Sequence, residues 1–303
     1  RPTATPTPAV RPTATPTPAV RPRVYKMHVV LPDDQSNEKK LMLEKLDVDV
    51  IIVPTCGISN PNHYVNRARQ LAMELNGYFI NQFENLHNFK IHYEETGPEI
   101  VKQVHELDCS SGNNRCTNSS SGTCIDGFVM SAGTGGTIAG ISKYLKENAE
   151  AEAEAELGNA NINANATHKH HKSNKPPGPR IRVALADPHG SSLLNKVKHG
   201  VCYTPQQKES KIKKHRYDSI VEGVGLDRIT NNFKQALPYI DHAYTATDQE
   251  IMDMAHIILK HEGILIGSSS ALNLCVTVKL AREYFQSEHY PSPTPLTNPN
   301  TNT

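Results

Sequence analysis

A glycine-rich turn between a predicted strand and a predicted helix carries the clearest chemistry in this sequence. The apolar run Phe128–Met130 predicts a short buried strand, and Ile138, Ile141 and Leu145 recur at helical spacing. Between them lies Ser-Ala-Gly-Thr-Gly-Gly-Thr, residues 131–137. Glycines let the backbone turn sharply, and the first turn of the helix presents unpaired N–H groups and the positive end of its dipole. The segment is therefore typical of a phosphate-binding turn.

The spacing of this turn excludes two well-known phosphate loops. A P-loop ends in Gly-Lys-Ser/Thr, whereas Gly136 is followed by Thr137 and Ile138. The dinucleotide fingerprint Gly-x-Gly-x-x-Gly, started at Gly133, would need a glycine where Ile138 stands, which argues against a nucleotide-binding dehydrogenase. An anion cup for one monophosphate remains, to which the hydroxyls of Thr134 and Thr137 add donors. The alternative is that the glycines serve only the packing of a tight strand-to-helix turn.

Composition narrows the class of protein. A chain of 303 residues can hold one large or two small domains. The formal net charge of +1 gives no reason to expect a nucleic acid or an anionic membrane as partner. No apolar run approaches the ~20 residues of a spanning helix, and residues 1–23 contain no apolar signal segment. Six scattered cysteines fit a reduced compartment. We therefore expect a cytoplasmic or mitochondrial protein that is not secreted.

The two ends and two internal stretches differ from the globular sequence. Residues 1–23 repeat the decamer RPTATPTPAV, and we expect them to form a disordered, polyproline-like tail such as a linker. Residues 287–303 are rich in Ser, Pro, Thr and Asn and predict a second disordered tail. Residues 108–124 and 147–178 are low-complexity inserts, which we expect to loop out between a helix and a strand.

Neither insert predicts a metal site. Cys109, Cys116 and Cys124 lack the Cys-x-x-Cys spacing of a zinc knuckle. The histidines at 168, 170 and 171 lie in a polar segment, where solvated side chains are the simpler interpretation.

The remaining sequence contains further strand and helix patterns. Thr96 and Glu99 resemble a capping box around Pro98 that would open a helix ending at Leu107. The other predicted helices cover 37–46, 61–75, 251–260 and 271–285, and the other predicted strands cover 27–31, 48–53, 78–80 and 180–186.

Several motifs point to one family when they are taken together. They are Asn81-Gln82-Phe83, Asn85, Asn88, His92, Thr96-Gly97-Pro98-Glu99-Ile100, Gly133–Thr137, Asp187–Ser191, Val221–Gly225 and Gly267–Ala271. This series resembles the cysteine synthase and cystathionine β-synthase family, most of all its fungal cysteine-synthase-like branch. These enzymes depend on pyridoxal 5'-phosphate. The resemblance covers roughly residues 24–286, apart from the two inserts.

The resemblance implies a fold and a layout of domains. The expected fold is the two-domain pyridoxal-phosphate fold type II, an α/β architecture of open, twisted, mostly parallel sheets with helices on both faces. Residues 24–107 would form a small-domain remnant and the start of the large domain. Residues 125–146 would supply the strand, loop and helix that bind phosphate, and 179–286 the rest of the large cofactor-binding domain.

The resemblance also implies roles for particular residues. Gly133, Thr134, Gly135, Gly136 and Thr137 would hold the cofactor phosphate. Gly223 would lie against the cofactor, where a side chain would clash, and Gln82 would help to hold the substrate carboxylate. For Gln82 a satisfied polar residue at a strand end is the alternative. A small amino-acid substrate and a homodimer are expected by family.

The implied reaction is β-replacement in cysteine biosynthesis. A leaving group departs from Cβ of serine or O-acetylserine, and sulfide or another thiol adds. The absence of a haem-binding Cys/His segment favours cysteine synthase over the animal cystathionine enzymes.

The chain also departs from the family pattern. In the family, the Schiff-base lysine and a Ser/Thr-Ser-Gly-Asn-Thr-Gly loop lie upstream of these motifs, where this chain has the proline repeat, and a serine-containing turn lies downstream. We therefore predict no catalytic residue and expect the polypeptide as written to be unstable or inactive. The alternative function is a catalytically dead remnant of the fold that acts as a binding or anchoring protein.

Overall fold

The computed structural model describes residues 25–111, 125–164, 181–204 and 219–289, which form two compact units. The first unit extends to Gly77 and the second begins at Tyr78. This division falls inside the predicted 24–107 segment. The N-terminal tail, residues 112–124 of the first insert, residues 165–178 of the second insert and residues 290–303 of the C-terminal tail lie outside the described residues.

The first unit contains two strands and two helices. Strand β1 (His28–Pro32) pairs in parallel with β2 (Asp49–Val53), and helices α1 (Asn37–Lys45) and α2 (Tyr64–Glu74) follow them in the chain. All four elements agree with the predicted segments to within a few residues. Among the described residues of this unit, the buried apolar ones are Val30 and Val65. Many others are exposed: Leu41, Met42, Leu46, Ile52, Met73 and Leu75.

The second unit is organised around a three-stranded parallel sheet in the order β3 (Gly127–Ser131), β4 (Arg182–Pro188), β5 (His242–Ala246). The central strand β4 is buried on both faces, as expected of an apolar run in a parallel sheet. Alternate β4 residues face opposite layers. Ala184 and Ala186 belong to one buried cluster, and Leu185 belongs to another.

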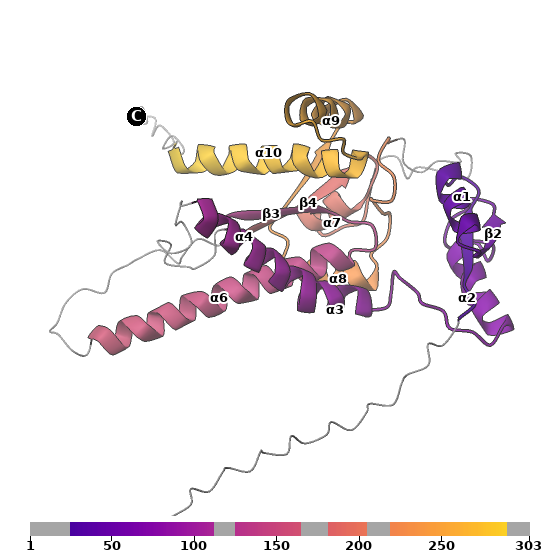
Figure 1. Cartoon of the computed structure of the whole chain (residues 1–303), viewed down its shortest axis with the longest axis horizontal. Coiled ribbons are helices and arrows are strands. Elements are labelled where there is room, and N and C mark those ends of the chain that lie inside the picture. The colour runs from indigo at the N-terminus through magenta and orange to yellow at the C-terminus, as the bar shows by residue number, and fades with distance from the viewer. Residues whose placement is uncertain (1–24, 112–124, 165–180, 205–218, 290–303) are drawn as a thin grey trace, which may run out of the picture. The chain divides into compact units, whose positions relative to one another are not determined.

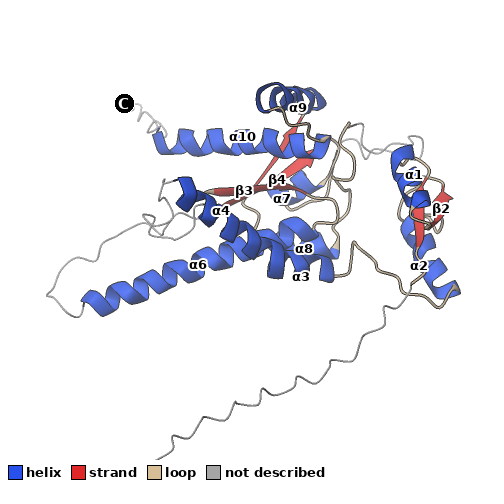
Figure 2. Ribbon diagram, in the orientation of Figure 1, coloured by secondary structure: helices blue, strands red, loops and turns tan. Residues whose placement is uncertain are grey.

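Helices cover both faces of this sheet (Figures 1 and 2). On one face, α10 (Ser268–His289) and α9 (Asp248–Glu262) supply the cluster around Ala184 and Ala186. On the other face, three helices pack around Leu185: α6 (Gly136–Ala164), α7 (Leu193–His199) and α8 (Asn231–Ala236). The predicted α/β class with parallel strands and helices on both faces is confirmed.

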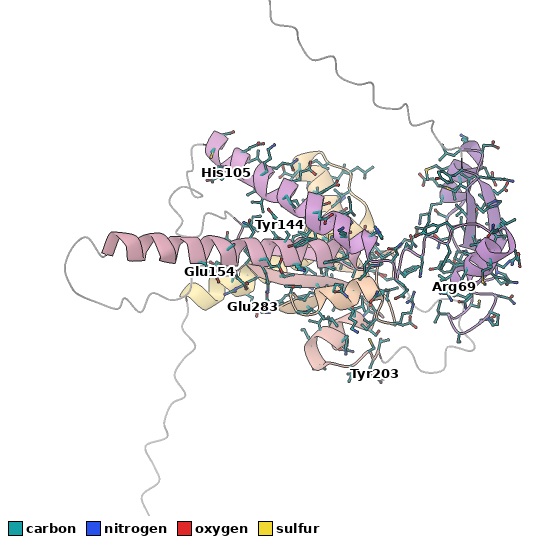
Figure 3. The ribbon with its side chains drawn as sticks, turned by 90° about the horizontal axis from the view of Figure 1, so that it is seen from below. Arg69, His105, Tyr144, Glu154, Tyr203 and Glu283 are labelled. Carbon is teal, nitrogen blue, oxygen red and sulfur yellow. The ribbon has the colours of Figure 1, made fainter. Side chains whose placement is uncertain are left out.

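One helical run packs across α6. It comprises α3 (His87–Ile91), a π-helical turn η1 (His92–Thr96) and α4 (Gly97–Ser111). A Cβ on Gly97 would lie 2.8 Å from the Tyr144 side chain, so glycine permits this close crossing. Tyr144 lies on the side of α6 that faces α4 (Figure 3).

Three predictions of secondary structure are wrong. The predicted helix ending at Leu107 is present as α4, but it does not open at a capping box, because the run is already helical from His87 and Thr96 Oγ1 lies 3.0 Å from His92 Nδ1. Residues 78–80 form no strand, and Tyr78 and Ile80 are exposed. The insert 147–178 does not leave the fold as a loop at residue 147. Its alanine and glutamate residues are strong helix formers, and they continue α6 to Ala164.

The remaining boundaries differ by smaller amounts. Strand β4 begins at Arg182, two residues after the predicted start. Helix α4 runs to Ser111, into the first residues of the other insert, and α10 extends to His289.

Candidate functional site

The predicted phosphate turn joins the carboxyl end of β3 to the start of α6. Two hydrogen bonds from other parts of the second unit hold the residues that lead from β3 into the turn. The backbone N–H of Ser131 donates to Asn273 Oδ1 at 2.8 Å, and the N–H of Gly225 donates to the Ala132 carbonyl at 2.8 Å. The turn is thus held between α10 and the loop that contains Gly225.

Three glycines of the turn are packed so closely that a side chain would not fit. A Cβ on Gly133 would lie 2.5 Å from the carbonyl oxygen of Gly223, and one on Gly136 would lie 2.2 Å from Asn88 Oδ1. Gly135 has a φ of +88° and would press a Cβ against Phe233 at 2.5 Å. Both the φ value and the close approach of neighbouring backbone require glycine here.

The backbone N–H groups of the turn are available as donors. Thr137 lies in the first turn of α6, where N–H groups have no intrahelical acceptor. Among the described residues, no acceptor is recorded for the N–H groups of Thr134, Gly135 and Thr137, and that of Gly136 makes only a long contact of 3.4 Å with Thr134 Oγ1. Asn88 Nδ2 donates to Thr134 Oγ1 at 2.8 Å, which leaves the hydroxyl proton of Thr134 free to donate. This arrangement suits an anion.

His92 bridges two threonine hydroxyls beside the turn. Its Nε2 lies 3.0 Å from Thr137 Oγ1, and its Nδ1 lies 3.0 Å from Thr96 Oγ1. Burial lowers the pKa of the His92 imidazole, so the ring is neutral and carries one proton. With that proton on Nε2, the ring donates to Thr137 and leaves the threonine hydroxyl proton free for an anion.

The loop around Gly223 lies against the phosphate turn. Gly223 and Gly225 have φ values of +78° and +85°, which explains the choice of glycine at both positions. A Cβ on Gly225 would meet Pro188 at 2.6 Å, whereas a Cβ on Gly223 would meet no described atom within 4 Å. The structure thus brings Gly223 next to Gly133 and leaves open space beyond its Cα.

Gln82 and the phosphate turn are both hydrogen-bonded to Asn88. Its backbone carbonyl accepts from Asn88 Nδ2 at 3.1 Å and from Asn232 Nδ2 at 3.1 Å, and Asn88 also reaches Thr134. The side chain of Gln82 is exposed and has no recorded hydrogen bond within the described ranges. Residues 78–80 form no strand, so Gln82 does not lie at a strand end, and its role toward a carboxylate stays a prediction. The preceding Asn81 has a φ of +53°, an uncommon value for a residue with a side chain.

Two buried polar residues of α8 and its N-cap contribute contacts that the sequence did not predict. Asn232 is fully buried, and its Nδ2 also donates to the Phe83 carbonyl at 2.8 Å. Thr230 is fully buried, and its hydroxyl donates to the Thr134 carbonyl at 2.6 Å. Asn88 and His92 entered the sequence prediction only as parts of motifs. Their contacts depend on tertiary packing that no local pattern reveals.

Comparison with known proteins identifies the family. The model of the pyridoxal-phosphate dependent enzyme family matches residues 21–289. The chain belongs to this family. Its predicted resemblance and its predicted fold type are confirmed, and the family depends on pyridoxal phosphate.

Two relatives of this chain are named cysteine synthases. The chain is 38% identical over 267 residues to cysteine synthase 2 of Schizosaccharomyces pombe, covering 86% of this chain and 56% of the relative. It is 36% identical to a putative mitochondrial cysteine synthase of Saccharomyces cerevisiae, with 85% and 56% covered. This chain therefore spans about half the length of these relatives.

A solved structure supports the same fold. The crystal structure of an O-acetylserine dependent cystathionine β-synthase from Helicobacter pylori superposes with a TM-score of 0.56 at 25% sequence identity, covering 84% of this chain and 62% of that one. In the described part of the chain, no helix has the length and apolar character needed to cross a bilayer. The same residues contain no cluster of His, Cys, Asp or Glu side chains suited to a metal ion.

Proposed function

We propose that this chain binds pyridoxal 5'-phosphate through the 133–137 turn and serves β-replacement in cysteine biosynthesis. In that reaction serine or O-acetylserine loses its Cβ substituent and sulfide or another thiol takes its place. The observation that carries the proposal is the cup of N–H donors at the start of α6. Family membership and two fungal relatives named cysteine synthases support the choice of reaction.

The residues present fit the phosphate group of this cofactor. The N–H groups of Thr134, Gly135 and Thr137 have no described acceptor, and the α6 dipole favours a dianion at this end. Thr134 and Thr137 add hydroxyls, and their neighbours Asn88 and His92 fix the two side chains.

The remaining predicted residues would serve the ring and the substrate. When bound, pyridoxal phosphate supplies an electron sink for chemistry at the amino-acid α-carbon. The open space at Gly223 would admit the ring close to the backbone, which refines the earlier prediction of a clash. Gln82 would hold the substrate carboxylate with its free side chain, while Asn88 and Asn232 fix its carbonyl.

Further properties follow from the same proposal. The substrate is a small amino acid, the assembly is a homodimer, and residues 125–146 and 179–286 act as the cofactor-binding domain. The protein is cytoplasmic or mitochondrial and is not secreted, and the name of the Saccharomyces cerevisiae relative supports the mitochondrion.

A ligand-binding comparison tests the proposal on the full chain. Calorimetric titration with pyridoxamine 5'-phosphate and with pyridoxamine measures the contribution of the phosphate. We expect the phosphorylated ligand to bind at least about tenfold more tightly, since hydrogen bonds to charged groups contribute about 1.5–3 kcal/mol each. Equal affinity for the two ligands would contradict the proposal.

A matched pair of glycine variants localises the binding. Gly135→Ala should abolish the phosphate preference, because the added Cβ meets Phe233 at a φ of +88°. Gly200→Ala introduces a Cβ at a φ of +76° with no atom within 4 Å, at the end of α7, and should retain the preference. Cysteine formation from O-acetylserine and sulfide by the loaded chain tests the reaction itself. Binding without this reaction would favour the alternative of a catalytically inactive binding protein.

A further inference from the structure

The Thr230 hydroxyl makes two hydrogen bonds inside the second unit. It donates to the Thr134 carbonyl at 2.6 Å and accepts from the N–H of Phe233 at 2.9 Å as the N-cap of α8. The side chain is fully buried, and α8 packs directly against α6 (Figure 1). Both the proton and a lone pair of this hydroxyl are therefore used.

The bond to Thr134 sets the direction of the neighbouring N–H group. The peptide between Thr134 and Gly135 is trans and planar, so its C=O and N–H point in opposite directions. Because the carbonyl points toward Thr230, the N–H of Gly135 points away from α8. That N–H has no acceptor among the residues the structure describes.

Glycine alone does not determine this orientation. Gly135 adopts positive and negative φ with similar ease, so the backbone permits the 134–135 peptide to rotate. The rotated peptide would direct the Thr134 carbonyl oxygen into the cup, where it would repel a phosphate dianion. A second interaction has to select the productive orientation, and the Thr230 hydroxyl is positioned to do so.

We propose that Thr230 is a positioning residue that locks the 134–135 peptide so that the Gly135 N–H is directed at the bound phosphate. This inference rests on the proposed function, because it assigns a control element to the same phosphate cup. The family motifs identified in the sequence do not include Thr230.

The test uses Thr230→Val, which keeps the shape of the side chain and removes the donor. Calorimetric titration of the full chain with pyridoxamine 5'-phosphate should show affinity about 10- to 100-fold weaker, the loss expected for one hydrogen bond to a charged group. Affinity for pyridoxamine should stay unchanged. Thr230→Ser restores the hydroxyl and should restore most of the phosphate preference.

Thr247→Val is the matched control for loss of a helix cap. Thr247 caps α9 as Thr230 caps α8, with its side chain accepting from the N–H of Glu250 at 3.2 Å. This variant should lose comparable stability in thermal unfolding and keep the affinity of the original chain for pyridoxamine 5'-phosphate. An equal loss of affinity in Thr247→Val would show that a missing cap, and not the peptide orientation, causes the effect.

The possible outcomes separate this inference from the proposed function. If the original chain prefers the phosphorylated ligand and Thr230→Val keeps that preference, the inference is overturned and the function stands. If the original chain has no such preference, both are overturned.

NMR of the unsubstituted chain gives a second test that does not depend on whether a variant folds. The Gly135 amide proton should move downfield on addition of inorganic phosphate, and an unmoved signal in a chain that binds phosphate by calorimetry overturns the inference.

Discussion

Replacing Asp187 with asparagine should change how the stability of the protein depends on pH. Asp187 lies near the carboxyl end of the central strand β4 and is fully buried. Its Oδ2 accepts from the N–H of Leu194 at 2.7 Å, and its Oδ1 has no recorded partner within the described residues. Burial raises the pKa of this carboxyl to about 7, despite the opposing hydrogen bonds from the Ser191 side chain and the Leu194 backbone.

The direction and size of the effect follow from this shift. Because the folded state binds the proton more tightly than the unfolded state, Asp187 contributes stability below its unfolded pKa of 3.8, and that contribution is lost as pH rises through about 7. Raising the pKa from 3.8 to about 7 corresponds to about 4 kcal/mol of stability, which is lost between these two pH values. Asparagine does not ionise, so this part of the pH dependence should disappear. Below about pH 4, where the carboxyl of the original chain is protonated in both states, the variant should be less stable, because its amide has a buried N–H group with no acceptor, at a cost of about 1–3 kcal/mol. At pH 5 this cost and the loss in the original chain should nearly cancel.

Urea unfolding followed by circular dichroism between pH 5 and 8 measures the difference. The free energy of unfolding of Asp187→Asn, relative to the original chain, should increase by about 1.4 kcal/mol per pH unit up to about pH 7 and then level off, with the variant the more stable protein above about pH 6. Asp253→Asn, which removes an exposed carboxylate of α9, controls for the loss of one negative charge. A constant difference between Asp187→Asn and the original chain over this range would refute the reasoning.

Two further substitutions probe buried polar groups in the second unit. Lys146→Met should lower the free energy of unfolding by about 2 kcal/mol, because the buried Lys146 donates from Nζ to both carboxylate oxygens of Asp241 at 2.7 Å and the variant loses these charge-assisted hydrogen bonds. Urea unfolding measures this, and a loss below about 1 kcal/mol would contradict it. His92→Asn should flatten the acid side of the stability profile. Since burial lowers the pKa of His92, the original chain should lose stability as pH falls from about 6.5 through that lowered value. Thermal unfolding from pH 7 to 5 checks this, and identical slopes for the two proteins would exclude His92 as the cause.

Local sequence patterns predicted most of the strands and helices. Strands β1 to β4 were predictable because they are short apolar runs followed by helical patterns. Strand β5 (His242–Ala246) was not predicted, because its residues form no apolar run. Two failures have physical causes. The alanine and glutamate residues after Lys146 read as low complexity, yet their helix propensity extends α6 far beyond the packed core. The apolar residues at 78–80 read as a strand, but no described strand pairs with them.

The candidate site was predictable only where its chemistry is local. The turn at 133–137 combines glycine, hydroxyl and helix start within a few residues, so its sequence alone indicates an anion cup. Thr230 and Asn88 were not predictable in this way. They contact Thr134 across separations of 96 and 46 residues in the sequence, and each has an ordinary local context. Their functions exist only after α8 and α3 have packed against α6.

This division between local and distant residues has an energetic reason. Glycine gives the turn its tight geometry but also leaves several backbone orientations accessible. Buried hydroxyl and amide groups remove that freedom, because each orientation other than the observed one would leave a buried donor or acceptor without a partner, at a cost of about 1–3 kcal/mol. Apolar residues of equal size at Thr230 and Asn88 would fill the same space without selecting a peptide direction. The polar neighbours of the turn therefore account for its precision, while the apolar clusters on both faces of the sheet account for its stability.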